Sequence, residues 1–152
     1  MSVERVLLTR RYRLECAHRL NGLRDGHKCS RLHGHNYEVQ LTVAMPADKL
    51  VNGMVIDAEN LDTDVRPVFA KLDHHFLNEL GGEEPLPGME PGQQIHLHGL
   101  RSAFAPLNEQ PTAENFALYL WRRLQFLSNN GSKRLVRVRV YENEDLWAEV
   151  GE

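Results

Sequence analysis

Three of the eight histidines in this 152-residue chain have the spacing of a metal site. His33 and His35 flank one glycine, and residues two apart on a strand point to the same side. His18 comes near the end of an earlier alternating segment, so antiparallel pairing would bring all three imidazoles to one end of a sheet. Three histidines with an open fourth position are typical of catalytic zinc. The sequence therefore predicts Zn²⁺ on His18, His33 and His35; the alternative is a set of hydrogen-bonded core histidines.

The two cysteines have different expected roles. Cys29 lies four residues before His33, in a loop that would arch over the metal site. A thiol near Zn²⁺ loses its proton readily and becomes a base or nucleophile at neutral pH. Two alternatives are that Cys29 is a fourth ligand of a closed structural site and that it is an ordinary loop thiol. Cys16 shares a strand face with Tyr12 and Leu14, which favours packing in the core.

Carboxylates occur at two further places of chemical interest. Asp73 precedes His74, and a carboxylate beside a histidine can fix its tautomer and raise its basicity; the alternative is a polar helix end. Glu142 continues the alternating face of Val138 and Val140, so its carboxylate would point toward the core. A ligand edge with two N–H donors would satisfy that carboxylate, whereas the alternative is a glutamate turned to water at the strand end.

Hydrophobic periodicity predicts the elements that would position these groups. In chain order, the expected elements are strands over 12–20 and 33–45, helices over 61–76 and 112–127, and strands over 136–142 and 146–150. Asp57 and Thr112 are suitable caps for the two helices, and Pro67 should kink or divide the first. The order of two strands, two helices and two strands fits one domain, residues 1–152, in which the first two strands form an antiparallel pair.

A long loop insertion is expected at 81–110, which holds five of the 11 glycines and four of the seven prolines. His96 and His98 repeat the His-x-His spacing there, but no strand pattern supports them, and they are expected to be solvated.

Composition excludes several classes of protein. The net charge of −3 argues against a nucleic-acid binder, and no stretch approaches 18 apolar residues, so no membrane association is expected. Two cysteines suggest a reducing, cytoplasmic location.

Six motifs together resemble the 6-pyruvoyl-tetrahydropterin synthase and 6-carboxy-tetrahydropterin synthase family. They are Ala-His-Arg-Leu at 17–20, Gly-His-Lys-Cys-Ser-Arg-Leu-His-Gly-His-Asn-Tyr at 26–37, Met-Val-Ile-Asp at 54–57, Leu-Asp-His-His-Phe-Leu-Asn at 72–78, Pro-Thr-Ala-Glu-Asn at 111–115 and Val-Tyr-Glu at 140–142. The resemblance spans nearly the whole chain. One departure is Gln110, which stands where asparagine is usual.

The resemblance implies an α+β tunnelling fold (T-fold), a four-stranded antiparallel sheet with two helices on one face, and two trimers stacked into a homohexamer. It also implies zinc on the three histidines, Cys29 as the general base, and Asp73 with His74 as a relay contributed by a neighbouring subunit. Glu142 would anchor the pterin ring, with Thr112 at the same pocket.

The implied substrate is 7,8-dihydroneopterin triphosphate. The compact cysteine motif is more similar to the bacterial enzymes of the queuosine route, which form 6-carboxy-tetrahydropterin, acetaldehyde and triphosphate. A pyruvoyl product of the biopterin type is the first alternative. Two others are a hydrolase that uses Cys29, His74 and Asp73 as nucleophile, base and orienter, and a zinc protein without turnover.

Overall fold

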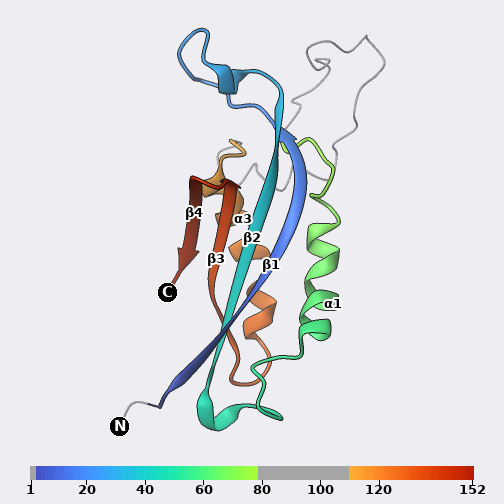
Figure 1. The fold of residues 1–152 in the computed structure, drawn as a ribbon, viewed down its shortest axis with the longest axis vertical. Helices are drawn as coiled ribbons and strands as arrows, with labels where there is room; N and C mark the ends of the chain where they lie inside the picture. The colour runs from blue at the N-terminus through green and yellow to red at the C-terminus, as the bar shows by residue number, and fades with distance from the viewer. Residues whose placement is uncertain (1–2, 79–109) are drawn as a thin grey trace.

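The computed structural model describes residues 3–78 and 110–152, which form an antiparallel sheet and two α-helices (Figure 1). The strands lie side by side in the order β1 (Arg5–His18), β2 (His33–Pro46), β3 (Arg134–Asn143) and β4 (Leu146–Gly151). Helices α1 (Ala58–Phe69) and α3 (Ala113–Arg123) come between β2 and β3 in the chain. Short 3₁₀ turns are η1 (Lys28–Ser30), η2 (Ala47–Lys49) and η4 (Gln125–Ser128). The predicted order of strands and helices is confirmed.

The pairing of β1 with β2 places their histidines together. The strands are antiparallel, with His18 opposite His33 and Cys16 opposite His35. β1 begins at Arg5, seven residues before the predicted start, because the long β2 supplies partners as far as Pro46. It ends at His18 rather than at residue 20.

Both helices cover the same face of the sheet. The Phe69 ring of α1 lies 4.8 Å from the ring of Tyr12, and the Phe116 ring of α3 lies 5.1 Å from that of Tyr37. Tyr12 and Tyr37 belong to the alternating positions of β1 and β2 that face the core. The predicted amphipathic pattern is thus confirmed.

The helix ends follow local hydrogen bonding. Asp57 accepts from the N–H groups of residues 59 and 60, and Thr112 Oγ1 accepts from that of Asn115. The first helix ends at Phe69, so its predicted extension to residue 76 is wrong. Pro67 does not divide the helix, because it is exposed and only two residues from the end.

A β-bulge near the start of β3 changes which side chain enters the core. The register against β2 shifts between Thr42 and Val43, and Leu135 joins the core cluster. Val136, which the alternation of Val138 and Val140 would place on the core face, is buried but lies outside that cluster because the extra residue inverts the alternation.

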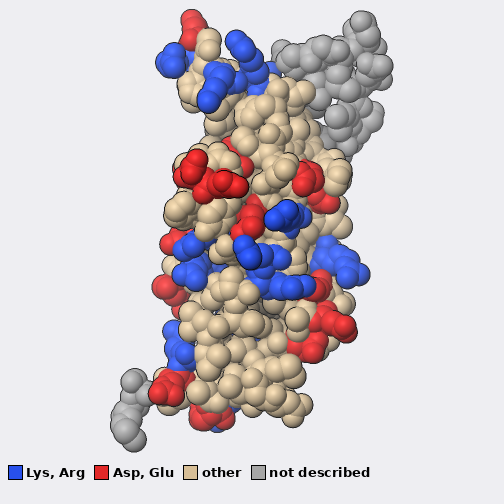
Figure 2. Space-filling model, in the orientation of Figure 1, with Lys and Arg blue, Asp and Glu red and all other residues tan. Residues whose placement is uncertain are grey.

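The opposite face of the sheet is charged. Figure 2 shows basic and acidic side chains gathered across its middle. Ion pairs on this face join Arg139 to Glu149 at 2.8 Å and Arg11 to Glu38 at 3.7 Å. Among the described residues, no helix is both long and apolar enough to cross a membrane. The predicted loop at 81–110, with His96 and His98, lies outside the described residues except for Gln110.

The carboxylate of Asp62 joins α1 to β1 and makes a testable contribution to stability. It accepts from Arg10 Nε and Nη2 at 3.1 and 2.8 Å and from Tyr12 Oη at 2.8 Å. The hydrogen bonds from Arg10 and then Tyr12 hold the pKa of Asp62 below its usual range, with Arg66 adding in the same direction. A carboxyl group whose pKa is lowered by folding stabilises the protein above its unfolded pKa of about 4 and loses this contribution as the pH falls further.

We therefore expect Asp62→Asn to lower the melting temperature at pH 7 by about 2–4 °C. Below pH 4 the difference from wild type should shrink, because the wild-type carboxyl is then protonated as well. The exposed Asp64 on the same helix provides the control Asp64→Asn, which should leave the melting temperature unchanged. A difference for Asp62→Asn that persists at pH 3 would contradict this account.

Candidate metal centre

Three imidazoles converge where the C-terminal end of β1 meets the start of β2. His18 Nε2 lies 3.0 Å from His33 Nε2 and 3.0 Å from His35 Nε2. His18 is fully buried, whereas His33 and His35 are half-buried. A side chain at Gly34 would bring its Cβ within 3.3 Å of the Cys16 carbonyl oxygen, so glycine suits the position between the two ligands. The structure brings the three residues together as strand alternation predicts.

Hydrogen bonds at Nδ1 of His18 and His33 determine which ring nitrogen carries the hydrogen in each neutral imidazole. His18 Nδ1 lies 2.8 Å from the Pro111 carbonyl oxygen, and His33 Nδ1 lies 2.6 Å from that of Arg31. A carbonyl oxygen only accepts, so each Nδ1 must carry a hydrogen. In neutral rings both Nε2 atoms then present lone pairs to the shared centre.

Glu142 places a carboxylate against this cluster of nitrogens. Its Oε1 lies 3.2 Å from His18 Nε2 and 3.0 Å from His35 Nε2. Hydrogen bonding from His18, when its Nε2 also carries a proton, and more weakly the charge of His35 hold the pKa of Glu142 below its usual range, so the carboxylate is charged at neutral pH. Burial lowers the pKa of His35 and favours its neutral ring despite Glu142.

Facing lone pairs and a carboxylate require positive charge between them. A proton on one ring can form a hydrogen bond to only one neighbouring group, whereas a divalent cation can be coordinated by all four groups. Tetrahedral zinc with Zn–N bonds near 2.0–2.1 Å separates its ligands by about 3.3–3.4 Å, close to the 3.0 Å found here. His18, His33, His35 and Glu142 could therefore hold a metal ion.

Cys29 lies near this centre along the chain but outside the donor group. Its carbonyl oxygen accepts from the Leu20 N–H at 2.8 Å, which fixes η1 beside the residues that follow His18. Within the described residues, the groups that could hold a metal do not include its thiol. Cys29 is half-buried.

Cys16 differs from Cys29 in burial and should differ in reactivity. Its Sγ donates to the Leu72 carbonyl oxygen at 3.2 Å, and burial raises its pKa to about 12. The Cys16 thiol therefore stays protonated, and a poor nucleophile, at pH 8. We expect iodoacetamide to alkylate Cys29 and to spare Cys16 until the protein is unfolded, as peptide mass mapping can show. Equal labelling of both thiols in the native protein would contradict this expectation.

Asp73 and His74 lie along the outer edge of β1. The segment 73–78 pairs in parallel with β1: His74 N–H donates to the Glu15 carbonyl at 2.6 Å and Ala17 N–H donates to that of residue 75 at 3.0 Å. Asp73 Oδ1 accepts from the Glu15 N–H at 2.8 Å, and its Oδ2 lies 3.0 Å from His74 Nδ1. Although partial burial raises the pKa of Asp73, the N–H of Glu15 and the ring of His74 hold it below its usual range.

The side chain of His74 is exposed to solvent and does not contact the clustered histidines of its own chain within the described residues. Its side chain is 76% exposed, and its φ of 59° lies in the left-handed region. Among the described contacts, none joins Asp73 or His74 to the metal cluster. The alternative of a polar helix end fits Asp73 in part, because its N–H donates to the Phe69 carbonyl oxygen at 2.9 Å in the turn that follows α1. Residues 74–77 then run beside β1.

Two groups near His18 are absent from the candidates taken from the sequence. One is the Pro111 carbonyl oxygen, a backbone atom that no side-chain pattern reveals. The other is Tyr37, whose Oη lies 3.1 Å from His18 Nδ1 and which shares the strand face of His35. The alternation of β2, which places Tyr37 on the same face as His35, could have identified Tyr37 from the sequence.

Thr112 caps α3 directly after Pro111, and its placement gives no further evidence of a binding role.

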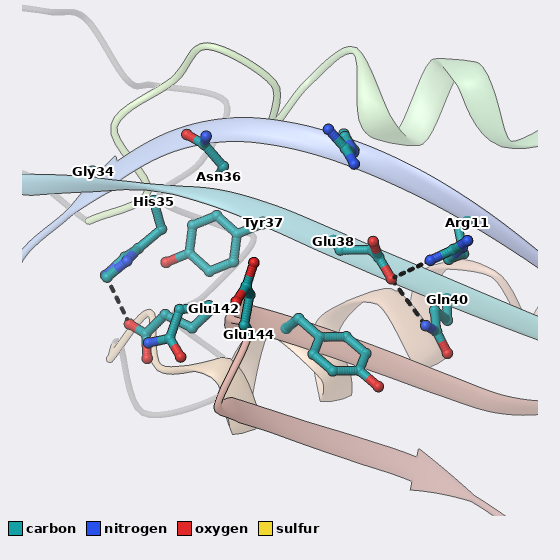
Figure 3. Close-up of a pocket in the computed structure, with 12 residues that line it drawn as sticks. Arg11, Gly34, His35, Asn36, Tyr37, Glu38, Gln40, Glu142 and Glu144 are labelled. Carbon is teal, nitrogen blue, oxygen red and sulfur yellow. Dashed lines mark hydrogen bonds and ion pairs between the residues drawn. The ribbon is translucent and has the colours of Figure 1, made fainter.

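A cavity of about 700 Å³ lies along the sheet, and two members of the metal cluster, His35 and Glu142, line it (Figure 3). Its lining comes from β1, β2 and the end of β3. His35 and Glu142 face one another at one end, and Arg11 pairs with Glu38 at the other. The volume is in the range that accommodates a small-molecule ligand.

Comparisons with known proteins show which family this chain resembles. A family model described as 6-pyruvoyl tetrahydropterin synthase matches residues 7–152. A protein of Rickettsia bellii named 6-carboxy-5,6,7,8-tetrahydropterin synthase is 32% identical over 146 residues, covering 93% of this chain and 97% of the relative. A Drosophila melanogaster protein named 6-pyruvoyl tetrahydrobiopterin synthase is 31% identical, over 89% of this chain and 73% of the relative.

The fold is shared with solved structures. The Caenorhabditis elegans 6-pyruvoyl tetrahydropterin synthase superposes with a TM-score of 0.69 at 22% identity, covering 100% of this chain and 99% of that one. This likeness confirms the predicted T-fold. Because the family model covers almost the whole sequence and the Rickettsia relative exceeds 30% identity along it, the chain belongs to the 6-pyruvoyl tetrahydropterin synthase family.

Proposed function

We propose that the protein is a zinc-dependent lyase that acts on 7,8-dihydroneopterin triphosphate. The products would be 6-carboxy-5,6,7,8-tetrahydropterin, acetaldehyde and triphosphate, with uptake of one water molecule, as a step of queuosine biosynthesis. The observation that carries the proposal is the convergence of three Nε2 atoms beside a cavity. The names of the relatives support the choice of substrate class. Two unpaired cysteines support a cytoplasmic location.

Each proposed residue has a distinct task. His18, His33 and His35 would hold zinc, which when bound polarises oxygens of the substrate side chain. Cys29, fixed close to the strand ends, would remove a proton from a side-chain carbon.

The remaining residues would bind the ring and return protons. The ionised Glu142 would accept two N–H donors of the pterin ring, with Thr112 near the same edge. Asp73 orients His74, which would exchange protons with the substrate.

We also propose that the active site is shared between subunits of a hexamer built from two trimers. His74 is exposed and makes no described contact with the histidines of its own chain, so a partner's His74 would complete the site. The edge of β4 and the N-terminal half of β1 remain unpaired among the described residues, and proteins rarely leave such edges open. Sedimentation should therefore show a multiple of three chains, and an active monomer would contradict the shared site.

A second product is favoured by one observation. The Drosophila relative named 6-pyruvoyl tetrahydrobiopterin synthase is almost as similar to this chain as the Rickettsia protein. The direct test is incubation with dihydroneopterin triphosphate, followed by mass analysis. Acetaldehyde with a carboxypterin supports the first proposal, and a pyruvoyl product supports the second. If no substrate is consumed, both are wrong, and a hydrolase or non-catalytic zinc protein becomes the better reading.

Glu142→Gln should weaken binding of the pterin ring much more than it weakens folding. A charge-assisted contact contributes about 1.5–3 kcal/mol, so affinity for dihydroneopterin should fall about 10- to 150-fold in titration calorimetry. Glu144→Gln is the matched control, because Glu144 lines the same cavity but makes no described contact with the histidines. An unchanged affinity with a collapsed melting temperature would assign Glu142 to the fold, and loss of zinc would assign it to the metal.

A further inference from the structure

Two amide side chains hold the stretch of chain that follows His18. Asn78 Oδ1 accepts from the Arg19 N–H and its Nδ2 donates to the Arg19 carbonyl, both at 2.6 Å. Gln110 repeats this arrangement at Asn21, with Oε1 accepting at 3.1 Å and Nε2 donating at 2.9 Å. Each amide occupies both backbone groups of one residue, as a neighbouring strand would. Asn78 and Gln110 therefore extend the hydrogen bonding of β1 beyond its last residue.

Gln110 also fixes the start of α3. Its own carbonyl oxygen accepts from Asn115 Nδ2 at 2.8 Å, which ties it to the first turn of the helix. The next residue is Pro111, whose carbonyl accepts from His18 Nδ1 at 2.8 Å. Proline has no N–H with which to anchor itself, so its position depends on the residues beside it.

The hydrogen bonds thus form a closed circuit from His18 along the chain to Asn21, through Gln110 to Pro111, and back to His18. Movement of Gln110 would move the carbonyl oxygen that holds the imidazole ring. That bond keeps the hydrogen on Nδ1 and leaves Nε2 free to face the shared centre.

We propose that Gln110 is a positioning residue for the metal ligand His18. It acts through Pro111, by keeping the carbonyl oxygen in reach of His18 Nδ1. The inference rests on the proposed metal-binding role of His18. Groups that orient a metal-bound histidine typically change metal affinity 10- to 100-fold when they are removed.

The test is the zinc affinity of Gln110→Ala, measured by competition with a chromogenic chelator. We expect the zinc dissociation constant to rise about 10- to 100-fold. The melting temperature of the metal-free protein should change little, because the bonds between Gln110 and Asn21 are exposed. Gln125→Ala is the matched control: Gln125 Nε2 also donates to a backbone carbonyl, that of Trp121, at 2.9 Å. Its zinc affinity should equal that of the wild type.

A second variant tests whether the effect of Gln110→Ala comes from lost hydrogen bonds or from the lost volume of the side chain. Gln110→Glu keeps the length and the acceptor for the Asn21 N–H but places an oxygen against the Asn21 carbonyl, so zinc should again bind more weakly.

Nitrogen-15 NMR of the His18 ring adds a readout independent of affinity. The Nδ1–H signal should be retained in the zinc-loaded wild type and in Gln125→Ala, and should shift or broaden in both Gln110 variants.

Zinc affinities of both Gln110 variants within twofold of the wild type would overturn the proposal. Equal weakening by Gln125→Ala would do the same, and failure of both Gln110 variants to fold would assign Gln110 to the fold instead. A wild-type protein that binds no zinc would refute the proposed function as well, which distinguishes the two failures.

Discussion

Replacing Cys29 with alanine should leave the zinc content of the protein at the wild-type level and lower turnover about 10²- to 10⁴-fold. The expectation follows from the donor set, because the candidate metal group contains three histidines and Glu142 but not the Cys29 thiol. Removing a base takes away proton transfer without altering the ligands. Metal analysis of the purified variant beside a rate assay with dihydroneopterin triphosphate measures both quantities.

The neighbouring Ser30 supplies the control for this prediction. Ser30→Ala lies in the same 3₁₀ turn, is exposed, and should keep both zinc and turnover. If Cys29→Ala is isolated without metal, the site is a closed cage of three histidines and one cysteine, and the assignment of Cys29 as the base is wrong.

His33→Ala should instead lose zinc and turnover together. His33 Nε2 is one of the three nitrogens that converge, and in the proposed site, where Glu142 binds the pterin ring, its loss leaves zinc with only two histidine ligands. Activity should fall to the rate measured without enzyme, because the metal ion both polarises and orients the substrate. The variant should still fold, because His33 is half-buried and its strand pairing uses backbone atoms.

A replacement that restores a donor tests whether the loss arises from ligation. His33→Cys supplies a thiolate, a common zinc ligand, and should recover part of the zinc content that His33→Ala loses. Full turnover in metal-free His33→Ala would exclude a role for the metal in the reaction.

The convergence of the histidines was predictable because it depends on strand alternation and on pairing between neighbouring strands. Residues two apart on β2 face one side, and antiparallel pairing sets His18 opposite His33. Helix starts were predictable for a similar reason, since Asp57 and Thr112 act on their own first turns.

Features that join distant segments through backbone atoms were not predictable. The parallel pairing of residues 73–78 with β1 uses N–H and carbonyl groups that every residue carries, so no side-chain pattern marks it. The same holds for the Pro111 carbonyl at His18. Alternation along β3 indicated that Glu142 faces inward, but its contact with two histidines depends on the register of β3 against β2, which alternation leaves open.

The paired amides of Asn78 and Gln110 also have a consequence for how this chain can be altered. They bind Arg19 and Asn21, so the chain leaving at residue 78 and returning at 110 is secured to points two residues apart. A change of sequence that displaced either amide would therefore loosen the residues that follow the proposed metal ligand His18.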